Sequence, residues 1–581
     1  MTTEDFRQSL LDYISKEKEY IEADIETHQN LDDDQKIEDG FLVKDAKVIS
    51  AWGINCYDLK AEINNTRFRP GDKAILTGKS RNTKVQIIEN GLDVISIICK
   101  SSLTIGESYS LEVCETYLLD PLTTVLELCT AGAPGYSYLS QLAGNLPVCA
   151  QGMFPFSEGT ALQYTGGLNE DQKDCCLGIS HNPSIFCMQG PPGTGKTRTL
   201  AAAAANMVSS QGQQILVVAF THQAVNNALN QMRKINSNAP IIKVGDNTKV
   251  QQLDPSIDVY SSMHSYRDSL VSVTKSGTKK KCKSPKGLVI GMTFHAALIN
   301  FGLQHPRCVF PTYLFLDEAS QMPLSYAAAL GTFGASSVCL FGDSRQMPPI
   351  FHSNLVSHDL SISILDYCSE KLTDVPIAVL HQTYRMNESI TDFVSHNFYE
   401  PHGIKLISAE SARDKTLCLD VSEVEDERIR NILGSEESIH TLDVSQNSNC
   451  QECNYEEALF AAQLASVAMQ SGLSADDIAI ITPFRRQVNA IRNALSNLGW
   501  KSGKQPLVDT VERLQGQDVE LIIISFATSD IEYLKIMDGF IFNHNRLNVM
   551  ISRAKSKVVL LASDAIKQGL KWNGLHIPSC S

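Results

Sequence analysis

From about residue 166 onwards, short apolar runs alternate with helix-forming stretches, and this alternation restricts the possible folds more than any other feature. The runs lie at residues 215–220, 288–292, 313–316 and 337–341, and a second series lies at 478–481, 521–526 and 557–561. Apolar runs without polar interruption are typical of strands that helices cover on both faces, as in parallel sheets. The sequence therefore predicts two consecutive α/β domains that meet near residue 375.

The first 165 residues have a different character. Phe6, Leu10, Ile14, Ile21 and Ile25 recur at spacings of four or seven, which predicts an amphipathic helix over residues 4–26 with a solvated acidic face. Residues 32–40 are expected to form a polar break. Residues 41–114 contain short runs rich in Val, Ile and Tyr between turn-forming residues, which predict a small β-barrel or β-sandwich. Residues 118–146 return to a helical pattern.

Composition excludes several classes of protein. The chain has 581 residues, of which 43% are apolar and 20% charged, which argues against a disordered or fibrous protein. No run approaches the roughly 18 apolar residues of a membrane span, and the N-terminus is acidic where a signal peptide is basic. Sixteen cysteines spread over a long chain are typical of reduced thiols inside the cell. We therefore expect a soluble protein, cytoplasmic or alternatively nuclear, and no membrane partner.

The net charge is concentrated at one end of the chain. A formal charge of −15 has the wrong sign for a protein that coats nucleic acid through bulk electrostatics. However, the first 40 residues hold thirteen acidic and four basic side chains, which account for nine of these negative charges. The remainder is nearly balanced, so a local basic groove is compatible with the composition.

Residues 190–197 read GPPGTGKT and fit the phosphate-loop pattern G-x-x-x-x-G-K-[ST]. Glycines let backbone N–H groups approach phosphate oxygens, and a helix that begins near Lys196 adds its positive end. Lys196 is expected to pair with the β- and γ-phosphates of ATP, and the Thr197 hydroxyl to bind Mg²⁺. The expected nucleotide-binding residues are Gly190, Pro191, Pro192, Gly193, Thr194, Gly195, Lys196, Thr197 and Arg198.

Two adjacent carboxylates, Asp317 and Glu318, follow the apolar run at 313–316. Strand side chains alternate between two faces, so the two residues are expected to have different roles. Asp317 would hold Mg²⁺, and Glu318 would orient and deprotonate an attacking water. A kinase that phosphorylates a bound substrate needs no such water-activating residue, so the pair favours a hydrolase.

Three further motifs follow in order: GDSRQMPP at residues 342–349, HQTYRM at 381–386 and RLNVMISRAK at 546–555. With these motifs the sequence resembles superfamily 1 helicases, specifically the up-frameshift-type branch of superfamily 1B. The resemblance covers about residues 165–565. It implies an α/β fold with two tandem RecA-like parallel-sheet domains, an N-terminal helical stalk and a small accessory β-barrel.

The resemblance implies further roles around ATP. Gln172 is similar to the glutamine that reads the adenine edge, and Tyr384 to the aromatic residue that stacks on the base. Gln346 resembles the γ-phosphate sensor that couples the two domains, and Arg385 and Arg553 resemble arginine fingers. The implied catalytic set is Lys196, Asp317, Glu318, Gln346, Arg385 and Arg553.

A less specific match to the same family lies at residues 508–518. Gln515 and Gly516 resemble a motif that touches both ATP and nucleic acid, and Gly516 and Asp518 are expected to bind the nucleotide. Asp518 stands where the family usually has Glu, and Glu512 stands where Asp is usual. Each carboxylate differs from the family's by one methylene in length, so the sequence leaves its contacts with ribose or backbone amides open.

Residues in strand-end loops resemble the positions with which the family grips the sugar-phosphate backbone. They are Thr221, His222, Thr293, Thr482, Pro483, Gln487 and Thr510. Loops at the carboxyl ends of parallel strands are where such folds bind ligands. A threonine in such a loop is also often a helix cap, which stays an alternative for each threonine named.

Two features keep other interpretations open. Residues 275–286 contain six lysines and no acidic residue, which fits a nucleic-acid-binding arm, a solvated loop or a nuclear-import signal. Cys450 and Cys453 form one Cys-x-x-Cys pair without a second pair at zinc spacing, so a metal site is not favoured there. Cys175, Cys176, His181 and Cys187 are expected in the core.

The predicted domains are a stalk helix (1–40), an accessory β-barrel (41–115), a second stalk helix with linker (116–164) and two RecA-like domains (165–375 and 376–581), the first with a basic insertion at about 245–286. The predicted function is an ATP-dependent nucleic-acid helicase or translocase with 5′-to-3′ polarity. It would use ATP and Mg²⁺ on single-stranded or partly duplex RNA or DNA, with protein partners at the stalk and barrel. The alternatives are an ATP-gated clamp or scaffold without unwinding, and a small-molecule phosphotransferase.

Overall fold

The computed structural model describes residues 1–52, 55–61, 64, 66, 68, 72–78, 82–90, 94–115, 119–148, 162–245, 253–273, 279–281, 286–303, 311–445, 449–500, 505–511 and 518–576. The chain divides into two compact units. Unit 1 comprises Met1–Gln189, Lys196–Asp343 and Pro348–Ala378. Unit 2 comprises Gly190–Gly195, Ser344–Met347 and Val379–Ser581.

The N-terminal helix α1 (Thr3–Gln29) belongs to two hydrophobic cores of unit 1. Phe6, Leu10 and Ile14 pack in the core of a large sheet, whereas Ile25 packs in the core of a barrel. The predicted amphipathic helix is therefore confirmed. Its two ends bury their apolar faces against different partners.

One acidic side chain of α1 contradicts the expected solvated face. Glu17 is buried, and its Oε1 accepts a hydrogen bond from the Tyr326 hydroxyl at 3.4 Å. Glu17 lies three residues after Ile14 on the face that packs against the unit, so the helix period carries it inward despite its charge.

A short helix, α2 (Asp33–Asp39), replaces the polar break expected at residues 32–40. The Asp32 side chain accepts a hydrogen bond from the Gln35 backbone at 2.9 Å, and Gly40 ends the helix with a left-handed backbone (φ +79°). Asp and Gly are preferred at these two positions. The residues that suggested a break are therefore the caps of a helix.

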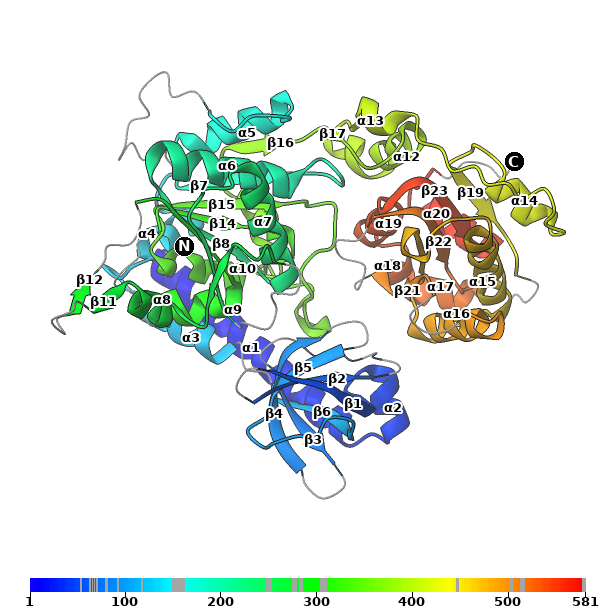
Figure 1. The fold of residues 1–581 in the computed structure, drawn as a ribbon, viewed down its shortest axis with the longest axis horizontal. Coiled ribbons are helices and arrows are strands. Elements are labelled where there is room, and N and C mark those ends of the chain that lie inside the picture. Colours follow the sequence, from blue (N-terminus) through cyan, green and yellow to red (C-terminus); the bar gives the residue numbers. More distant parts are fainter. Residues whose placement is uncertain are drawn as a thin grey trace. The chain divides into compact units, whose positions relative to one another are not determined.

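Six strands close into a barrel (Figure 1). They are β1 (Leu42–Trp52), β2 (Cys56–Lys60), β3 (Lys73–Thr77), β4 (Asn82–Asn90), β5 (Val94–Ile98) and β6 (Ser108–Glu115). The order is β1-β2-β5-β4-β3-β6, and all neighbouring strands are antiparallel. Alternate residues such as Ala46 and Val48 or Ile95 and Ile97 fill the interior. Two helices follow the barrel, α3 (Leu119–Leu128) and α4 (Tyr136–Leu142).

The large sheet of unit 1 has eight strands in the order β10-β9-β13-β8-β14-β15-β7-β16. Along the chain they are β7 (Ile185–Gln189), β8 (Gln214–Ala219), β9 (Ile241–Val244), β10 (Asp258–Tyr260), β13 (Leu288–Thr293), β14 (Tyr313–Leu316), β15 (Ser337–Gly342) and β16 (Ile377–Val379). All pairs from β10 to β7 are parallel. One face of this sheet shares a core with α1, α3 and α4. The parallel sheet therefore also anchors the N-terminal helices.

The helices that connect these strands are α5 (Glu170–Ser180), α6 (Lys196–Gln211), α7 (His222–Ile235), α8 (Met263–Ser269), α9 (Phe294–Ala297), α10 (Leu324–Ala327) and α11 (Ile364–Glu370). A separate antiparallel pair is formed by β11 (Val271–Val273) and β12 (Lys279–Lys281). The described part of the range 245–286, which was predicted as a basic insertion, contributes to both the sheet and the core of unit 1. Strand β10 extends the sheet, and Met263 and Tyr266 of α8 are buried in the core.

Unit 2 contains a five-stranded parallel sheet in the order β19-β23-β22-β20-β21 (Figure 1). The strands are β19 (Ile439–Leu442), β20 (Ile478–Ile481), β21 (Leu507–Asp509), β22 (Val519–Ser525) and β23 (Ala554–Leu561), and a short parallel pair is formed by β17 (Gln382–Thr383) and β18 (Ile407–Ser408). The helices are α12 (Glu388–Val394), α13 (Glu410–Arg413), α14 (Glu427–Leu433), α15 (Tyr455–Gln470), α16 (Arg485–Asn497), α17 (Ile531–Ile536), α18 (Asp538–Ile541), α19 (His544–Ile551) and α20 (Asp564–Trp572).

Strand β22 illustrates why the apolar runs are uninterrupted. Leu521 and Ile523 face a core shared with α15 and α16, whereas Ile522 and Ile524 face a second core shared with α12, α19 and α20. Side chains alternate between the faces of a strand, so a strand covered on both faces needs apolar residues at every position. The prediction of two parallel α/β sheets is confirmed.

The seven predicted strands are all present with slightly shifted ends. The sequence interpretation missed β7, β9, β10, β16, β19 and β21. Of these, β10, β16 and β21 have only three residues each, which is too short to show a hydrophobic period.

Candidate functional site

Residues 190–195 link β7 with α6 at the carboxyl end of a parallel strand. Gly193 (φ +72°) and Gly195 (φ +84°) have left-handed backbones, which residues with a Cβ rarely adopt. The buried Thr194 hydroxyl donates a hydrogen bond to the Pro191 carbonyl at 2.7 Å. Helix α6 begins at Lys196 and has 16 residues. This strand–loop–helix arrangement can bind phosphate through backbone N–H groups and the helix end.

The acidic pair lies just beyond strand β14, which ends at Leu316. Glu318 has a left-handed backbone (φ +56°), and its N–H donates to Asp317 Oδ1 at 3.0 Å. We expected strand alternation to point the two carboxylates in different directions, but strand β14 ends before both residues. The left-handed backbone of Glu318, and not strand alternation, therefore sets the direction of its side chain. A left-handed non-glycine residue is strained and is found preferentially at functional sites.

Electrostatics link Asp317 to Lys196 within unit 1. Burial, followed by the Glu318 carboxylate, raises the pKa of Asp317 to about 7, whereas the charge of Lys196 acts in the opposite direction. A divalent cation would compensate the two neighbouring acids, so this pair fits Mg²⁺. Among the residues described, no group of three acidic, His or Cys side chains could enclose a metal. Mg²⁺ needs only one or two carboxylates when phosphate oxygens supply other ligands.

Sequence reasoning missed two polar residues beside this site. The Gln189 side chain, at the end of β7, donates to Asp343 Oδ1 at 2.6 Å, and both side chains are buried. The Asp343 backbone N–H donates a hydrogen bond to the Ser320 hydroxyl at 3.4 Å. Asp343 belongs to the GDSRQMPP motif, so its place in that motif was the available signal.

Segment Gly190–Gly195 groups with unit 2, where it contacts Tyr384 and Arg385. The Tyr384 N–H donates to the Gly193 carbonyl at 2.9 Å. A Cβ added at Gly193 would lie 2.5 Å from both Arg385 Cβ and Thr383 Oγ1. Tyr384 is 38% exposed, so part of its ring is available for stacking. Two of the residues predicted to bind nucleotide from the HQTYRM motif thus lie against the phosphate loop.

Both predicted arginine fingers lie beside Asp518. Arg385 Nη2 is 2.7 Å and Arg553 Nη1 is 3.8 Å from the same Asp518 oxygen, Oδ1. Arg385 Nη1 also donates to the Ser552 carbonyl at 2.9 Å. The structure therefore brings these three predicted residues together. Gly516, predicted beside Asp518, lies outside the described residues, as do Gln515 and Glu512.

The remaining predicted nucleotide contacts are placed by local structure. Gln172 is buried and forms a capping box with Asn169 at the start of α5, with hydrogen bonds of 3.0 and 2.9 Å. Arg198 on α6 is exposed and donates to the Gly166 carbonyl at 3.2 Å. The capping box with Asn169 therefore fixes the orientation of the Gln172 side-chain amide.

Gln346 lies in Ser344–Met347, the second short segment that groups with unit 2. Its neighbours are held by α19, because Asn545 donates to the Ser344 carbonyl at 3.2 Å and Asn548 to the Arg345 carbonyl at 2.6 Å. Sequence reasoning missed both asparagines, although Asn548 lies within the RLNVMISRAK motif.

Thr221 and Thr293 both cap helices, as the alternative interpretation had it. The Thr221 hydroxyl accepts a hydrogen bond from Ala224 N–H at 3.2 Å at the start of α7, and Thr293 accepts one from Ala296 N–H at 3.4 Å. Thr221 is exposed, whereas Thr293 is buried, and His222 is the first residue of α7. A capping role leaves an exposed threonine available at the carboxyl edge of the sheet.

The predicted nucleic-acid contacts of unit 2 need correction. Gln487 is fully buried, and its amide bonds to the Asn454 backbone and the Ser525 hydroxyl at 2.8 to 3.0 Å. Thr482 is also fully buried, and its hydroxyl accepts from Phe484 N–H at 3.4 Å. These side chains cannot contact nucleic acid where the structure places them. Pro483 and Thr510 are buried as well.

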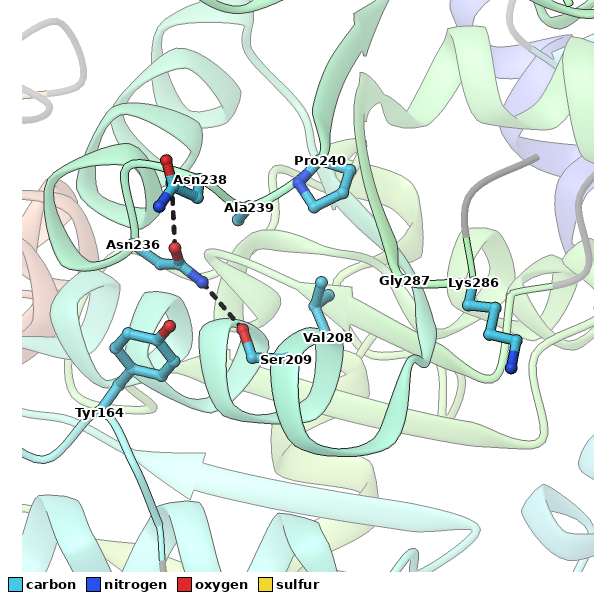
Figure 2. Close-up of a pocket in the computed structure, with 9 residues that line it drawn as sticks. All are labelled: Tyr164, Val208, Ser209, Asn236, Asn238, Ala239, Pro240, Lys286 and Gly287. Atoms are coloured by element: carbon cyan, nitrogen blue, oxygen red, sulfur yellow. Dashed lines mark hydrogen bonds between the residues drawn. The ribbon is translucent and has the colours of Figure 1, made fainter.

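A cavity of about 370 Å³ lies in unit 1. Figure 2 shows Asn236 between Ser209 and Asn238, to which it is hydrogen-bonded at 2.8 and 3.1 Å. Pro240 and Gly287, which also line it, directly precede β9 and β13. The cavity therefore sits at the amino ends of these parallel strands, and we assign it no part in the chemistry.

Several predictions concern residues outside this site. Cys175, Cys176 and Cys187 are buried, as expected, whereas Cys450 and Cys453 are partly exposed. The prediction for His181 is wrong, because this residue is exposed at the C-terminal end of α5. The lysine-rich range 275–286 lies largely outside the described residues, so its contact with nucleic acid stays a prediction. Within the described part of the chain, no helix combines the length and apolar character that crossing a membrane requires.

Two models described as AAA domains match residues 167–287 and 360–565. The DNA replication ATP-dependent helicase/nuclease dna2 of Schizosaccharomyces pombe is 28% identical over 430 residues, which cover 68% of this chain and 28% of that protein. The DNA polymerase alpha-associated DNA helicase A of the same organism is 27% identical over 451 residues, covering 70% of this chain and 64% of that protein. The chain thus spans less than two thirds of either relative.

Among solved structures, an Arterivirus nonstructural protein 10 (helicase) aligns with 90% of this chain and 80% of its own, at 10% identity and a TM-score of 0.39. The family assignment depends instead on the two AAA-domain matches and the helicase relatives, which cover the region of the motifs. The chain belongs to the superfamily 1B helicases of the up-frameshift type.

Proposed function

We propose that this protein is an ATP-dependent nucleic-acid helicase or translocase that moves 5′ to 3′ along a single strand. The observation that carries the proposal is the placement of Tyr384 and Arg385 against the phosphate loop, with Arg385 sharing Asp518 with Arg553. Arginines at a phosphate loop are the arrangement that stabilises charge developing on a transferred phosphoryl group.

In this proposal each group has a distinct task. Lys196 and the loop N–H groups would hold the β- and γ-phosphates, and Thr197 and Asp317 would hold Mg²⁺. When bound, the ion would neutralise part of the negative charge of the phosphates. Glu318 would take a proton from the attacking water.

Three residues would report the state of the nucleotide to the rest of the protein. Gln346 would sense the γ-phosphate, whereas Arg385 and Arg553 would stabilise the charge that develops on it. Because these contacts exist only while the γ-phosphate is attached, hydrolysis would release them and permit movement along the strand.

The proposed organisation assigns residues 165–375 and 376–581 to two motor domains, and residues 1–164 to a stalk and barrel that guide the strand or bind protein partners. Exposed Thr221 and the neighbouring His222 are the proposed backbone contacts that the described structure leaves accessible. Grip on the backbone predicts little sequence specificity and strong salt dependence. The relatives named as DNA helicases make single-stranded DNA the first substrate to test, with RNA as the second.

The test is strand displacement by the full chain with ATP and Mg²⁺. A duplex with a 5′ single-stranded tail is expected to be separated, whereas the same duplex with a 3′ tail is expected to stay paired. ATP hydrolysis without displacement of either duplex would favour the clamp alternative. ATP hydrolysis that single strands do not stimulate would favour a small-molecule phosphotransferase.

A further inference from the structure

A single carboxylate in unit 2 binds both arginines that the proposed function assigns to ATP hydrolysis. Asp518 Oδ1 lies 2.7 Å from Arg385 Nη2 and 3.8 Å from Arg553 Nη1. We propose that Asp518 is a positioning residue: it holds Arg385 and Arg553 together in the absence of nucleotide and releases them to the γ-phosphate of ATP. This inference rests on the proposed function and adds to it a residue that sets the balance between ATP and ADP.

The burial of the two arginine side chains makes this more than a surface ion pair. The side chains of Arg385 and Arg553 are 14% and 10% exposed, so both guanidinium groups are largely removed from water. Asp518 is 36% exposed. Two cations in a desolvated site repel each other strongly unless an anion lies between them. Asp518 is the anion that the structure places there.

The hydrogen-bond donors of the Arg385 guanidinium group indicate how it would bind a phosphate. Nη1 donates to the Ser552 carbonyl at 2.9 Å, and Nη2 pairs with Asp518. Within the described part of the chain, the buried Nε has no hydrogen-bond partner. A guanidinium group binds oxyanions through two neighbouring N–H groups. Nε and Nη2 would form such a pair for a phosphate oxygen once Nη2 leaves Asp518.

The position of Asp518 also argues against the ribose contact considered from the sequence. Its Oδ1 already faces two guanidinium groups, and the aspartate side chain is one methylene shorter than the usual glutamate. Because the Asp518 carboxylate pairs with both guanidinium groups, it competes with the γ-phosphate for the two arginines. ADP lacks that phosphate, so the competition acts mainly on ATP.

This role predicts a particular kinetic signature for Asp518→Asn. Without the negative charge of Asp518, both arginines can bind the γ-phosphate without competition. The KM for ATP is therefore expected to fall by about threefold. Loss of the anion also lets the two cations separate and misalign, so kcat is expected to fall by about tenfold. A purely structural defect would lower kcat without tightening the binding of ATP.

The experiment measures steady-state ATP hydrolysis by the full chain with saturating single-stranded DNA, together with equilibrium binding of ADP and of a non-hydrolysable ATP analogue. Asp518→Glu keeps the charge and is expected to stay within about threefold of wild type in kcat and KM. Asp426→Asn is the matched control. It removes another acid that pairs with an arginine, Arg428, at 2.7 Å, while Asn can keep the helix cap.

Each of three results would overturn the role of Asp518. The first is an Asp518→Asn variant that behaves like Asp426→Asn. The second is a raised KM for ATP that is lost with 3′-deoxy-ATP, since this would identify a ribose ligand. The third is a lowered kcat with unchanged KM that Asp518→Glu fails to restore.

The proposed function can fail separately. If the wild-type chain does not hydrolyse ATP, the proposed function is wrong, whereas the binding measurements still decide this inference. In that case, an unchanged ratio of ATP-analogue to ADP affinity in Asp518→Asn would overturn it.

Discussion

Glu457 accepts a hydrogen bond from the Ser525 hydroxyl at 2.7 Å in the interior of unit 2. The Ala527 N–H donates to the same carboxylate oxygen at 2.8 Å, and Glu457 is fully buried. Burial raises the pKa of Glu457 to about 7, although these hydrogen bonds act in the opposite direction. Ser525 also binds Gln487 at 2.9 Å, so this network holds the ends of β22 and α16 together.

Replacement of Glu457 by Gln is expected to weaken the pH dependence of stability. Between pH 4.5 and about 7 the folded state keeps a proton that the unfolded state releases, so this group lowers stability as pH rises. Glu457→Gln removes that contribution, which is about 2 kcal/mol in order of magnitude. Thermal unfolding at pH 5 and pH 8 measures it. Glu532→Gln, which alters an exposed acid paired with Lys535, is the control. An unchanged pH slope in Glu457→Gln would contradict the prediction.

Lys196→Ala is expected to reduce ATP hydrolysis by at least about 100-fold, because it removes the cation at the start of α6 that would stabilise the transferred phosphoryl group. Lys173→Ala is the control, since Lys173 pairs with Glu170 on the surface of α5. Steady-state ATPase rates with single-stranded DNA provide the measurement. A normal rate of ATP hydrolysis in Lys196→Ala would show that residues 190–197 are not the phosphate loop of the ATP site.

Glu318→Gln is expected to bind ATP and nucleic acid normally but to hydrolyse ATP about 100-fold more slowly. The amide keeps the size of the side chain but cannot accept the proton of water. Single-turnover hydrolysis and nucleotide binding measured on the same samples separate the two steps. Glu127→Gln on α3 serves as the control. Wild-type turnover in Glu318→Gln would show that another group is the base.

The substitution Thr221→Asp is expected to preserve the helix cap of α7 but to weaken the binding of nucleic acid. Asp caps helices well, so thermal stability is expected to change by less than about 0.5 kcal/mol. The new negative charge would repel a phosphate, so affinity for single-stranded DNA is expected to fall about tenfold at low salt. Ser262→Asp introduces the same charge at the cap of α8 and is expected to leave affinity unchanged. Equal affinities for all three proteins would exclude Thr221 from the nucleic-acid surface.

The local motifs of the nucleotide site could be predicted because each is contiguous in the chain. Glycine spacing alone indicates a tight turn before Lys196, and apolar runs with helices between them indicate a parallel sheet. The left-handed backbone of Glu318 carries no such pattern. For this reason the sequence suggested two roles for Asp317 and Glu318 but did not indicate the backbone that sets the direction of the Glu318 side chain.

Contacts between residues that lie far apart in the sequence were decided by packing. Gln487 and Thr482 looked like exposed loop residues, yet residues far along the chain bury them. Asp518 meets Arg385, 133 positions earlier, only because β22 and β17 belong to one folded unit. Hydrogen bonds and ion pairs depend on distances of a few ångströms, whereas residue order specifies only neighbours along the chain. The identity of the chemical groups could therefore be read from the order of residues, but their partners emerged only with the fold.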